Sequence, residues 1–557
     1  MFVPFVFLME PIADYGFLIP FYNYVDMVKD KGWPIIAHER YYQSLEKMRK
    51  LGVDDALLQK SGKLWKFTPP TQQTLDDLHK FMIPQDFETD LIAQFPSQQD
   101  AWIHLLTTNH PVFESIISDI LDEIEAQYNN DVIEGILCYC LPLSLRAVAD
   151  KRGIPILCQH GGAIRPPFYK DFIGYMDKVD FFAKGELEER FLRFREESQQ
   201  SPLLSRKGLF KLFVSEQHLG DIHFIDNEPI FDVGVLLTAP FSSVGLVLQH
   251  SHISNEEICL RVRRKYPAES VLIRAHPNFT LHQDANDESP TSFHFSCKCT
   301  TVVTIIGSGV FEVMWIGRKM RTYVDNPFCF MEAGDLGGHD ADIAPLDFIN
   351  FVIFAYMHPM EWMTDPKHLR FLLSEPSEVD VYMKAFKHHT SHLSEDDIEL
   401  FYKTEGREYR LGMPLFFTSG IIAHQSAFLY STQGLSVCEG AFTWSDGDSS
   451  CFEFDLTEVI GGDLMVDARL SMVIVNENGE QVVTCLVNDV QVGSVTLSEQ
   501  SRSLAYKIPG HLAKNKKLSI AFNYSDATFL GGGDRKLAVA FEQLRISHFD
   551  NTPIDII

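Results

Sequence analysis

The stretch that decides the fold is VIEGILC at residues 132–138, followed by SLRAVADK at 144–151 and IPILC at 154–158. The first and third pieces are short apolar runs with the length of a buried strand, and the middle piece has the pattern of a helix. A strand, a crossover helix and a second strand of this size form a β-α-β unit with parallel strands. The sequence therefore predicts a layered α/β fold at this point.

The same alternation of strands and helices extends on both sides of this unit, from residue 1 to about residue 430. Strands are predicted at 2–8, 34–37, 132–138, 154–158, 179–183, 233–237, 271–274, 301–306 and 321–324, and helices at 22–31, 111–128, 144–151, 186–197, 255–265 and 309–316. A polar, weakly patterned stretch at 199–227 separates two series of elements. We therefore predict two Rossmann-like domains that face a cleft, at 1–225 and 226–430, with ligands bound at the carboxyl ends of the strands.

The last segment, 434–557, changes character, because short strand patterns continue there without any long helical pattern. Strands are predicted at 464–475, 481–487, 518–522 and 537–541. Asn478-Gly479 between the first two is a strong hairpin signal. We predict an all-β sandwich as an accessory domain.

The chain has 557 residues and a formal net charge of −28. Binding to nucleic acid or to anionic lipid draws on clustered Lys and Arg, so this balance argues against both kinds of partner. No charged leader precedes the apolar residues 1–9, and no run approaches the ~20 apolar residues of a membrane-spanning helix. The ten cysteines contain no CxxC pair, as expected of reduced thiols. We predict a cytoplasmic protein with at most peripheral association at the inner face of the membrane.

Glycine, histidine and arginine gather in QHGGAIRPPFY at 159–169, directly after the predicted strand at 154–158. A parallel sheet presents its ligand-binding loops at this position. Arg165 is able to grip a phosphate or a carboxylate with two parallel hydrogen bonds, and His160 is able to act as a general base. The structural alternative is a turn whose histidine and arginine satisfy nearby carbonyl groups.

A second group of polar residues, RAHP at 274–277, ends the predicted strand at 271–274. Arg274 and His276 are able to donate hydrogen bonds to phosphate oxygens, and Pro277 fixes the loop that follows. Alone, a His-Pro pair is also an ordinary loop sequence.

A third group, GSGVFE at 307–312, connects the predicted strand at 301–306 to the following helix. The backbone amides of Gly307, Ser308 and Gly309 at a helix start form a natural phosphate site. Glu312, about one turn into the helix, would accept hydrogen bonds from ribose hydroxyls. The alternative here is a glycine-rich turn with a capping serine.

The order of these groups along the chain resembles that of bacterial capsule and lipopolysaccharide glycosyltransferases of the GT-B fold, particularly the Kdo-transferase-like branch. The resemblance covers much of 154–328, and its clearest pieces are GAIRPPFY at 162–169, HP at 276–277 and the stretch 308–328. It implies that His276, Ser308 and Glu312 hold the donor nucleotide, while His160 and Arg165 lie across the cleft near the sugar or the acceptor. It also implies a nucleotide-sugar co-substrate, with CMP-Kdo as the first expectation, and a glycan or lipid-linked glycan as acceptor.

Two positions depart from the pattern of that family. Related loops often carry a glutamate where this chain has His160, and PFSS at 240–243 lacks the acidic residue that the Kdo branch places there. Double displacement needs a nucleophilic carboxylate. We therefore favour direct displacement, with His160 or Glu10, which ends the first predicted strand, as the base.

Two other functions are compatible with the same residues. The first is phosphoalcohol transfer from a CDP-alcohol, as in teichoic-acid-type polymerases, which look similar at the His-Pro and Ser/Gly positions. The second is a non-catalytic glycan-binding or scaffold protein, which the missing carboxylates suggest.

The sequence predicts no metal site and no bound cofactor. GDLGGHDAD at 334–342 has metal-ligand residue types, but its spacing fits neither an EF-hand nor a zinc site, and His388, His389 and His392 are expected to lie at a solvated helix end. No GxxxxGK[ST] loop is present.

One aromatic motif, FTWSDG at 442–447, stands out in the C-terminal segment. Trp444 would stack on a sugar ring if it is exposed, and Asp446 would bind sugar hydroxyls. A core tryptophan that anchors two sheets is the favoured alternative.

Overall fold

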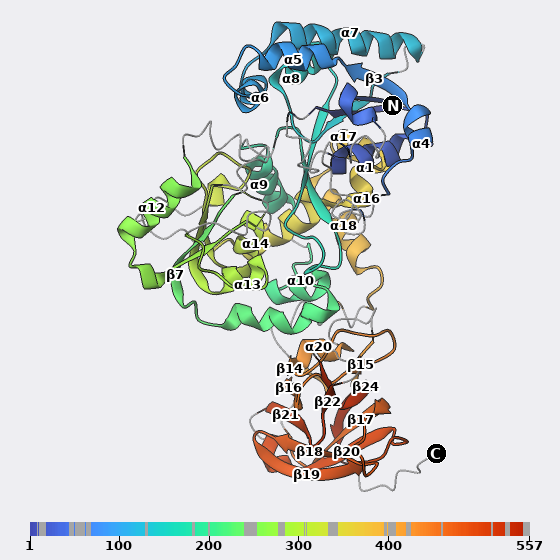
Figure 1. Ribbon diagram of the computed structural model, residues 1–557, viewed down its shortest axis with the longest axis vertical. Helices are drawn as coiled ribbons and strands as arrows, with labels where there is room; N and C mark the ends of the chain where they lie inside the picture. Colours follow the sequence, from blue (N-terminus) through green and yellow to red (C-terminus); the bar gives the residue numbers. More distant parts are fainter. Residues whose placement is uncertain are drawn as a thin grey trace. The chain divides into compact units, whose positions relative to one another are not determined.

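The computed structural model describes the chain except for residues 8, 10–17, 44–49, 51–61, 63–67, 129–131, 181–183, 199–200, 239–252, 277–283, 306, 308, 332–342, 395–397, 399–407, 419–424, 458–459, 514–515, 530–534 and 550–557. The chain divides into two compact units (Figure 1). The first unit comprises Met1–Leu203 and Asn227–His389, and the second comprises Leu204–Asp226 and Thr390–Ile557.

The first unit contains a seven-stranded sheet with the strand order β11-β6-β5-β4-β1-β2-β3. Its strands are β1 (Phe2–Val6), β2 (Pro34–His38), β3 (His79–Ile83), β4 (Gly135–Cys138), β5 (Ile156–Gly161), β6 (Ile173–Asp177) and β11 (Met357–Pro359). From β3 to β5 neighbouring strands are parallel, whereas β6 runs antiparallel to β5 and β11 antiparallel to β6. β1 and β4 are buried at every position, as expected of strands covered on both faces.

Helices cover this sheet and close its core. They are α1 (Leu18–Val28), α4 (Gln72–Asp76), α5 (Gln85–Ile92), α6 (Gln98–Thr107), α7 (Pro111–Gln127), α8 (Leu143–Arg152) and α9 (Leu187–Glu197). α7 begins where the His110 side chain accepts a hydrogen bond from the Phe113 amide, with Pro111 in the first helical turn. Figure 1 shows α5, α6, α7 and α8 grouped together beside the sheet.

A second, four-stranded parallel sheet has the order β10-β9-β7-β8. Its strands are β7 (Phe231–Leu236), β8 (Val271–Arg274), β9 (Cys299–Thr304) and β10 (Lys319–Arg321), with helices α12 (Asn255–Lys265), α13 (Ser292–Cys297) and α14 (Gly309–Ile316) between them. The side chains of Ser254 and Thr291 cap the first turns of α12 and α13. Val233, Val271 and Val303 belong to one buried apolar cluster of this sheet.

After the second sheet the chain returns to the first. α15 (Leu346–Phe351) and the π-helix η6 (Val352–Tyr356) lead into β11, which is followed by α16 (Met360–Met363), α17 (Pro366–Leu373) and α18 (Glu378–Thr390). β11 pairs with β6, so Met357 lies opposite Tyr175. Because β11 pairs with β6, the chain from Asn227 to His389 belongs to the first unit. The sequence instead places one domain boundary near residue 225 and another near residue 430.

The second unit is rich in sheet. One sheet contains β12 (Glu408–Tyr409), β14 (Ser431–Gln433), β16 (Ser449–Leu456), β18 (Gln481–Val487), β19 (Val490–Leu497) and β21 (Lys517–Tyr524), and the other contains β13 (Pro414–Phe416), β15 (Thr443–Trp444), β17 (Leu464–Val473), β20 (Ser503–Ile508) and β24 (Val539–His548). Phe541 of the second sheet lies 6.4 Å from Phe452 and 5.9 Å from Phe522 of the first, between ring centroids. The sheet-rich C-terminal region that the sequence predicts is confirmed.

Residues 204–226 form part of this second unit, although they come before the second sheet in the sequence. They contain α10 (Arg206–Phe213) and the 3-10 helix η3 (Glu216–Asp226). His223 Nε2 lies 3.3 Å from the carbonyl oxygen of Leu429, and a side chain at Gly220 would meet the carbonyl oxygens of Phe428 and Ser431 at about 3 Å. The second unit is therefore assembled from two separate pieces of the chain.

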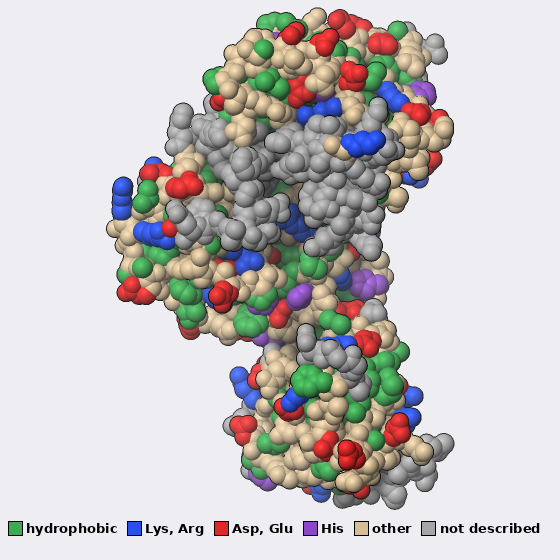
Figure 2. Space-filling model, viewed as in Figure 1, with side chains coloured by type: hydrophobic (Ala, Val, Ile, Leu, Met, Phe, Trp, Pro, Cys, Tyr) green, Lys and Arg blue, Asp and Glu red, His purple; other side chains and the backbone are tan. Residues whose placement is uncertain are grey.

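The surface reflects the acidic composition. Figure 2 shows Lys and Arg side chains interspersed among Asp and Glu on the visible face. Within the described ranges, no helix has the length and apolarity needed to span a bilayer.

Candidate functional site

His160 lies near the end of β5, opposite Tyr175 in the β5–β6 pair, because β5 continues to Gly161 and not to residue 158 as the sequence predicts. His160 Nε2 lies 3.0 Å from Asp180 Oδ1, and the Tyr139 ring packs at 4.9 Å from the imidazole. Asp180 is itself held in place, because its other carboxylate oxygen accepts a hydrogen bond of 3.0 Å from the amide of Leu141. A carboxylate that accepts from one imidazole nitrogen fixes the orientation and the tautomer of the ring.

The chain then passes close to β6 and turns. A side chain at Gly162 would lie 2.2 Å from the carbonyl oxygen of Ile173, so only glycine fits at this position. Arg165 follows on the surface, and its side chain makes no hydrogen bond or ion pair with the part of the chain that the structure describes. Its positive charge helps to lower the pKa of His276 and opposes the rise in the pKa of Glu312.

Glu312 lies in the first turn of α14 and is 3% exposed. Its Oε1 accepts a 2.6 Å hydrogen bond from the Tyr169 hydroxyl, and its Oε2 accepts a 2.7 Å hydrogen bond from the Ser292 hydroxyl. Burial raises the pKa of the Glu312 carboxyl, while the two hydroxyls and the charges of Arg165 and Arg274 oppose that rise. The carboxyl group therefore joins the loop after β5 to the start of α14.

His276 follows β8 by two residues. Burial, reinforced by the charge of Arg165, lowers its pKa to about 4. The ring is therefore neutral near pH 7 and is able both to donate and to accept a hydrogen bond.

Arg274, the last residue of β8, already has hydrogen-bond partners within the protein. Its Nη1 donates to Asp287 Oδ2 at 2.6 Å and to the carbonyl oxygen of Ser289 at 2.7 Å. The Asp287 side chain is 0% exposed, so this ion pair fixes the arginine at the end of the strand. Arg274 contributes charge to the site from a fixed position.

The turn between β9 and α14 leaves room for a ligand near its backbone. A side chain built at Gly307 would meet no atom within 4 Å, and one built at Gly309 would meet only the Leu236 side chain, at 4.0 Å. The Gly309 amide lies at the start of α14, where backbone N–H groups lack partners within the helix.

The structure thus brings together Arg165, from the loop after β5, with Arg274 at the end of β8, His276 in the loop that follows and Glu312 in the first turn of α14. Three predicted site residues, Glu10, Pro277 and Ser308, lie outside the described residues, as do the loops at 240–243 and 334–342.

The other predicted positions are elsewhere in the chain. Trp444 is 8% exposed and packs in a buried cluster with Leu537 and Ala540, which is the core arrangement favoured from the sequence. Asp446 is half-buried. Over the described ranges, no three His, Cys, Asp or Glu side chains are grouped so as to hold a metal ion, and His388 lies 3.5 Å from Glu361.

Four residues of this site are missed by sequence reasoning. Asp180, Tyr139, Ser292 and Asp287 contact the predicted residues, but none of them falls in a motif with a fixed spacing. Asp287 follows its partner by 13 residues and Asp180 follows His160 by 20, across segments without a recognisable pattern. Tyr139 directly follows the strand predicted at 132–138, whereas Asp180 falls inside the strand predicted at 179–183 and Ser292 begins α13.

The sequence profile of the glycosyltransferase 99 family N-terminal domain matches residues 2–183 of this chain. That segment contains His160, Arg165, Tyr169 and Asp180. No curated protein sequence matches the chain. The profile match supports a glycosyltransferase-like protein at a coarse level.

Among solved structures, the β-Kdo 2,7-transferase of KpsC from Thermosulfurimonas dismutans is similar at 12% identity and a TM-score of 0.30, over 46% of this chain and 89% of that chain. The β-Kdo 2,4-transferase of the same KpsC has 12% identity and a TM-score of 0.28, over 41% and 81%. A family 35 carbohydrate-binding module from an environmental isolate has 15% identity and a TM-score of 0.13, over 21% and 75%. These scores are too low to support a conclusion about this chain.

Proposed function

We propose that the chain is a nucleotide-sugar-dependent glycosyltransferase with a GT-B arrangement of the two sheets of its first unit. The proposed donor is a nucleotide sugar, with CMP-Kdo as the first to test, and the proposed acceptor is a bacterial surface polysaccharide or a lipid-linked glycan. The observation that carries the proposal is the 2.6 Å hydrogen bond from Tyr169 to Glu312, which holds the loop that contains Arg165 against the start of α14. The profile match over residues 2–183 supports the same class of reaction.

In this proposal the second sheet binds the nucleotide. His276, neutral near pH 7, donates a hydrogen bond to a phosphate oxygen, and the amides of Gly307 and Gly309 face the same phosphate from the start of α14. The Arg165 guanidinium has no hydrogen bond or ion pair among the described residues, and in this proposal it grips the phosphate or a carboxylate of the donor sugar. These donors stabilise the negative charge that develops on the leaving phosphate, without the need for a metal.

The base in this proposal is His160. Asp180 holds Nε2, so Nδ1 is the nitrogen that acts as the base in this proposal. The acceptor hydroxyl attacks the anomeric carbon of the donor, its proton passes to His160 Nδ1, and the bond from that carbon to the phosphate oxygen breaks. The nucleotide leaves with the bonding electron pair, so direct displacement inverts the configuration of the anomeric carbon.

A thermal-shift screen with CMP, CDP, UDP, GDP, ADP and dTDP tests the donor site. A ligand that binds only the folded protein raises its midpoint of unfolding. We expect one nucleotide to raise the midpoint of the native chain, His276→Ala to lose the shift, and His511→Ala, a change in the second unit, to keep it. If no nucleotide shifts a folded protein, the non-catalytic glycan-binding alternative replaces this proposal.

Product analysis separates the two transferase alternatives. Incubation with CMP-Kdo and an acceptor glycan should yield free CMP together with a glycan extended by one sugar. Release of CMP from a CDP-alcohol, with a phosphodiester in the product, would instead assign the teichoic-acid type of reaction.

A further inference from the structure

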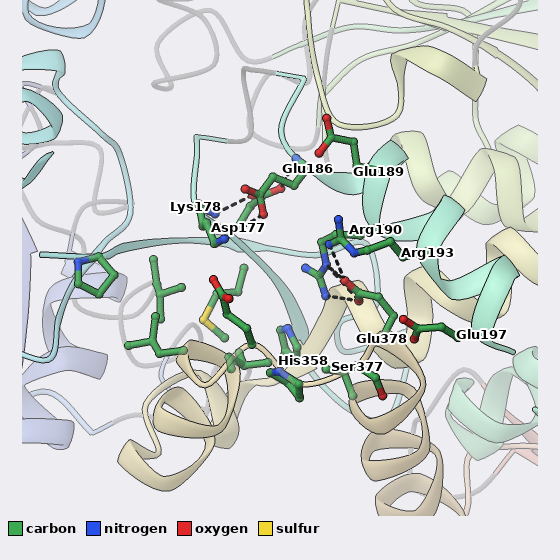
Figure 3. Close-up of a pocket in the computed structure, with 18 of the residues that line it drawn as sticks. Asp177, Lys178, Glu186, Glu189, Arg190, Arg193, Glu197, His358, Ser377 and Glu378 are labelled. Atoms are coloured by element: carbon green, nitrogen blue, oxygen red, sulfur yellow. Dashed lines mark hydrogen bonds and ion pairs between the residues drawn. The ribbon is translucent and has the colours of Figure 1, made fainter. Parts of the chain in front are cut away.

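A pocket of about 880 Å³ lies over the β5, β6 and β11 part of the first sheet, with walls from α9, α17 and α18 (Figure 3). Its volume is within the range of small-molecule sites, about 300–1,000 Å³. The lining includes none of the residues assigned to the donor site or the base: Arg165, Arg274, His276 and Glu312 are absent from it, and so is His160. This pocket is therefore a separate feature of the first unit.

Three lining residues lie on one face of the sheet. Gln159 pairs with Met176, and Gly174 pairs with His358, so Leu157, Met176 and His358 all point to the same side of the strands. Leu157 and Met176 supply apolar surface. His358 supplies a polar group in the middle of β11. In Figure 3, His358 and Ser377 both lie below the Arg190–Glu378 pair.

His358 is 1% exposed, and its Nε2 has no hydrogen-bond partner among the residues that the structure describes. Leaving a buried nitrogen without a partner destabilises a folded protein, so such atoms usually meet a ligand or water. Because His358 lines the pocket, the pocket is the place where its partner would bind.

A chain of hydrogen bonds determines which proton His358 carries. Lys384 Nζ lies 2.9 Å from His368 Nδ1, and His368 Nε2 lies 3.2 Å from His358 Nδ1. A lysine ammonium group is only a donor, so each histidine accepts through Nδ1 and carries its proton on Nε2. Burial lowers the pKa of both histidines, that of His368 to about 3, which keeps both rings neutral. His358 therefore presents an N–H donor to the pocket.

The other polar groups of the pocket are mostly acceptors. Seven acidic residues line it against three basic ones. Two of the basic residues, Arg190 and Arg193, are already bound to Glu378. The exposed carboxylates of Glu189, Glu197 and Glu375 lie on the rim without an ion pair among the described residues. This excess of negative charge opposes an anionic ligand.

We propose that this pocket binds a neutral saccharide. A hydroxyl group both accepts and donates, so it satisfies the His358 N–H and the carboxylates at the same time, while the sugar ring covers Leu157 and Met176. A cation would leave the His358 N–H without an acceptor, and an anion would meet the surplus of carboxylates. This site goes beyond the proposed transferase function and does not depend on it.

The test is saturation-transfer NMR on the full chain with three neutral disaccharides, namely maltose, cellobiose and lactose. Spermidine and glucose 6-phosphate serve as the cationic and anionic probes. We expect saturation transfer to at least one neutral disaccharide at millimolar concentration and a weaker response from the two charged probes. Leu373→Trp, which fills the pocket from α17, should abolish the signal, and Leu192→Trp, on the exposed side of α9, should keep it.

His358→Leu tests the hydrogen bond itself, and we expect it to weaken binding about tenfold, with circular dichroism confirming that the variant is folded. Failure of all three disaccharides to bind would overturn the proposal. So would binding that survives in Leu373→Trp, or a preference for either charged probe. If a nucleotide still raises the midpoint of unfolding of Leu373→Trp, the proposed donor site is intact in that variant. The result for disaccharide binding is then separate from the result for the proposed transferase function.

Discussion

Two arginines of the first unit have opposite surroundings. Arg190 is 13% exposed and is held by Glu378, to which Nε and Nη2 donate at 3.0–3.2 Å, while Nη2 also donates to the carbonyl oxygen of Ala355. Arg165 is exposed and makes no hydrogen bond or ion pair within the described part of the chain. Both lie close to a carboxyl group whose pKa is raised by burial, Asp177 for Arg190 and Glu312 for Arg165.

The difference shows that the charge of Arg190 is balanced within the fold, whereas the charge of Arg165 is not paired among the described residues. Glu378 balances Arg190, so that guanidinium holds α9 to α18 and has little left for a ligand. Glu312 takes its two hydrogen bonds from the hydroxyls of Tyr169 and Ser292 instead, which leaves Arg165 able to bind an anion. The buried carboxyl near the exposed Arg165 is thus satisfied by neutral donors.

The largest effect is expected from Glu378→Ala. This change leaves Arg190 buried without its carboxylate, and breaking a buried pair in this way costs about 3–5 kcal/mol of unfolding free energy. Urea denaturation followed by circular dichroism measures the loss. Glu197→Ala, an exposed carboxylate on α9, should change the same quantity by less than about 0.5 kcal/mol. If Glu378→Ala and Glu197→Ala lowered the unfolding free energy equally, Glu378 would not be needed to balance Arg190. The distinction between Arg190 and Arg165 would then not hold.

The second prediction concerns Arg165→Ala. Charge-assisted hydrogen bonds contribute about 1.5–3 kcal/mol, so the affinity for the nucleotide that stabilises the native chain should fall about 10- to 100-fold. The unfolding free energy should stay within about 0.5 kcal/mol of the native value, because the side chain is exposed. Calorimetric titration with the nucleotide measures the affinity, and Arg264→Ala, an exposed arginine on α12, is the matched control. Unchanged affinity would remove Arg165 from the site.

The third prediction concerns Glu312→Gln and pH. Burial raises the pKa of Glu312 above its ordinary value of 4.5, so between pH 4.5 and the raised pKa the folded protein binds more protons than the unfolded chain. The stability of the native chain relative to Glu312→Gln therefore falls as the pH rises through this window, with a slope of at most about 1.4 kcal/mol per pH unit. Denaturation of both proteins at several pH values measures this difference, which should be largest below pH 4.5. A difference independent of pH would show that Glu312 does not titrate in this range.

The smallest effect is expected from Asp180→Asn. The substitution keeps the shape of the side chain but weakens its hold on His160 Nε2, a contribution of about 1 kcal/mol. Turnover with the identified donor should fall several-fold, while the KM for the donor stays unchanged, because Asp180 orients the base and does not bind the nucleotide. A change in donor KM of the same size would assign Asp180 to binding instead.

Much of the fold follows from local patterns. The helices at 255–265 and 309–316 and the strands at 271–274 and 481–487 have the predicted bounds. The helix at 255–265 and the strand at 481–487 have a clear period, whereas 271–274 and 309–316 are mainly apolar runs limited by polar residues or glycine. The strand predicted at 301–306 is observed at Cys299–Thr304, and the strand at 321–324 is observed at Lys319–Arg321. Such shifts are expected where an apolar run continues past the end of the pairing.

Other elements depend on distant partners. The strand predicted at 179–183 is not found in the described part of that range, and the sheet instead uses β6 at Ile173–Asp177. Gly174 and the charged end of β6 weaken its local pattern, which is stabilised by β5 on one side and by β11 on the other. β11 has only three residues, too few to carry a period, so the return of the chain to the first sheet was not predicted.

The candidate site divides in the same way. Arg165, His276 and Glu312 were found because each comes soon after a strand, Arg165 and His276 in loops and Glu312 in the first turn of α14, and sequence patterns identify such positions. The hydroxyl of Ser292 and the carboxylate of Asp180 were not found, because their contacts depend on how separate segments pack. The fixed pairing of Arg274 with Asp287 was missed for the same reason.

The pairing of β11 with β6 has a consequence for synthesis of the chain on the ribosome. Tyr175 and Met357 lie opposite each other, yet every strand of the second sheet is translated between them. The second sheet therefore has the opportunity to fold while the edge of the first sheet is still open, and that open edge is a template for wrong pairing. A shortened gene that ends before residue 357 would leave this edge permanently uncovered, so the smallest fragment worth expressing extends through α18.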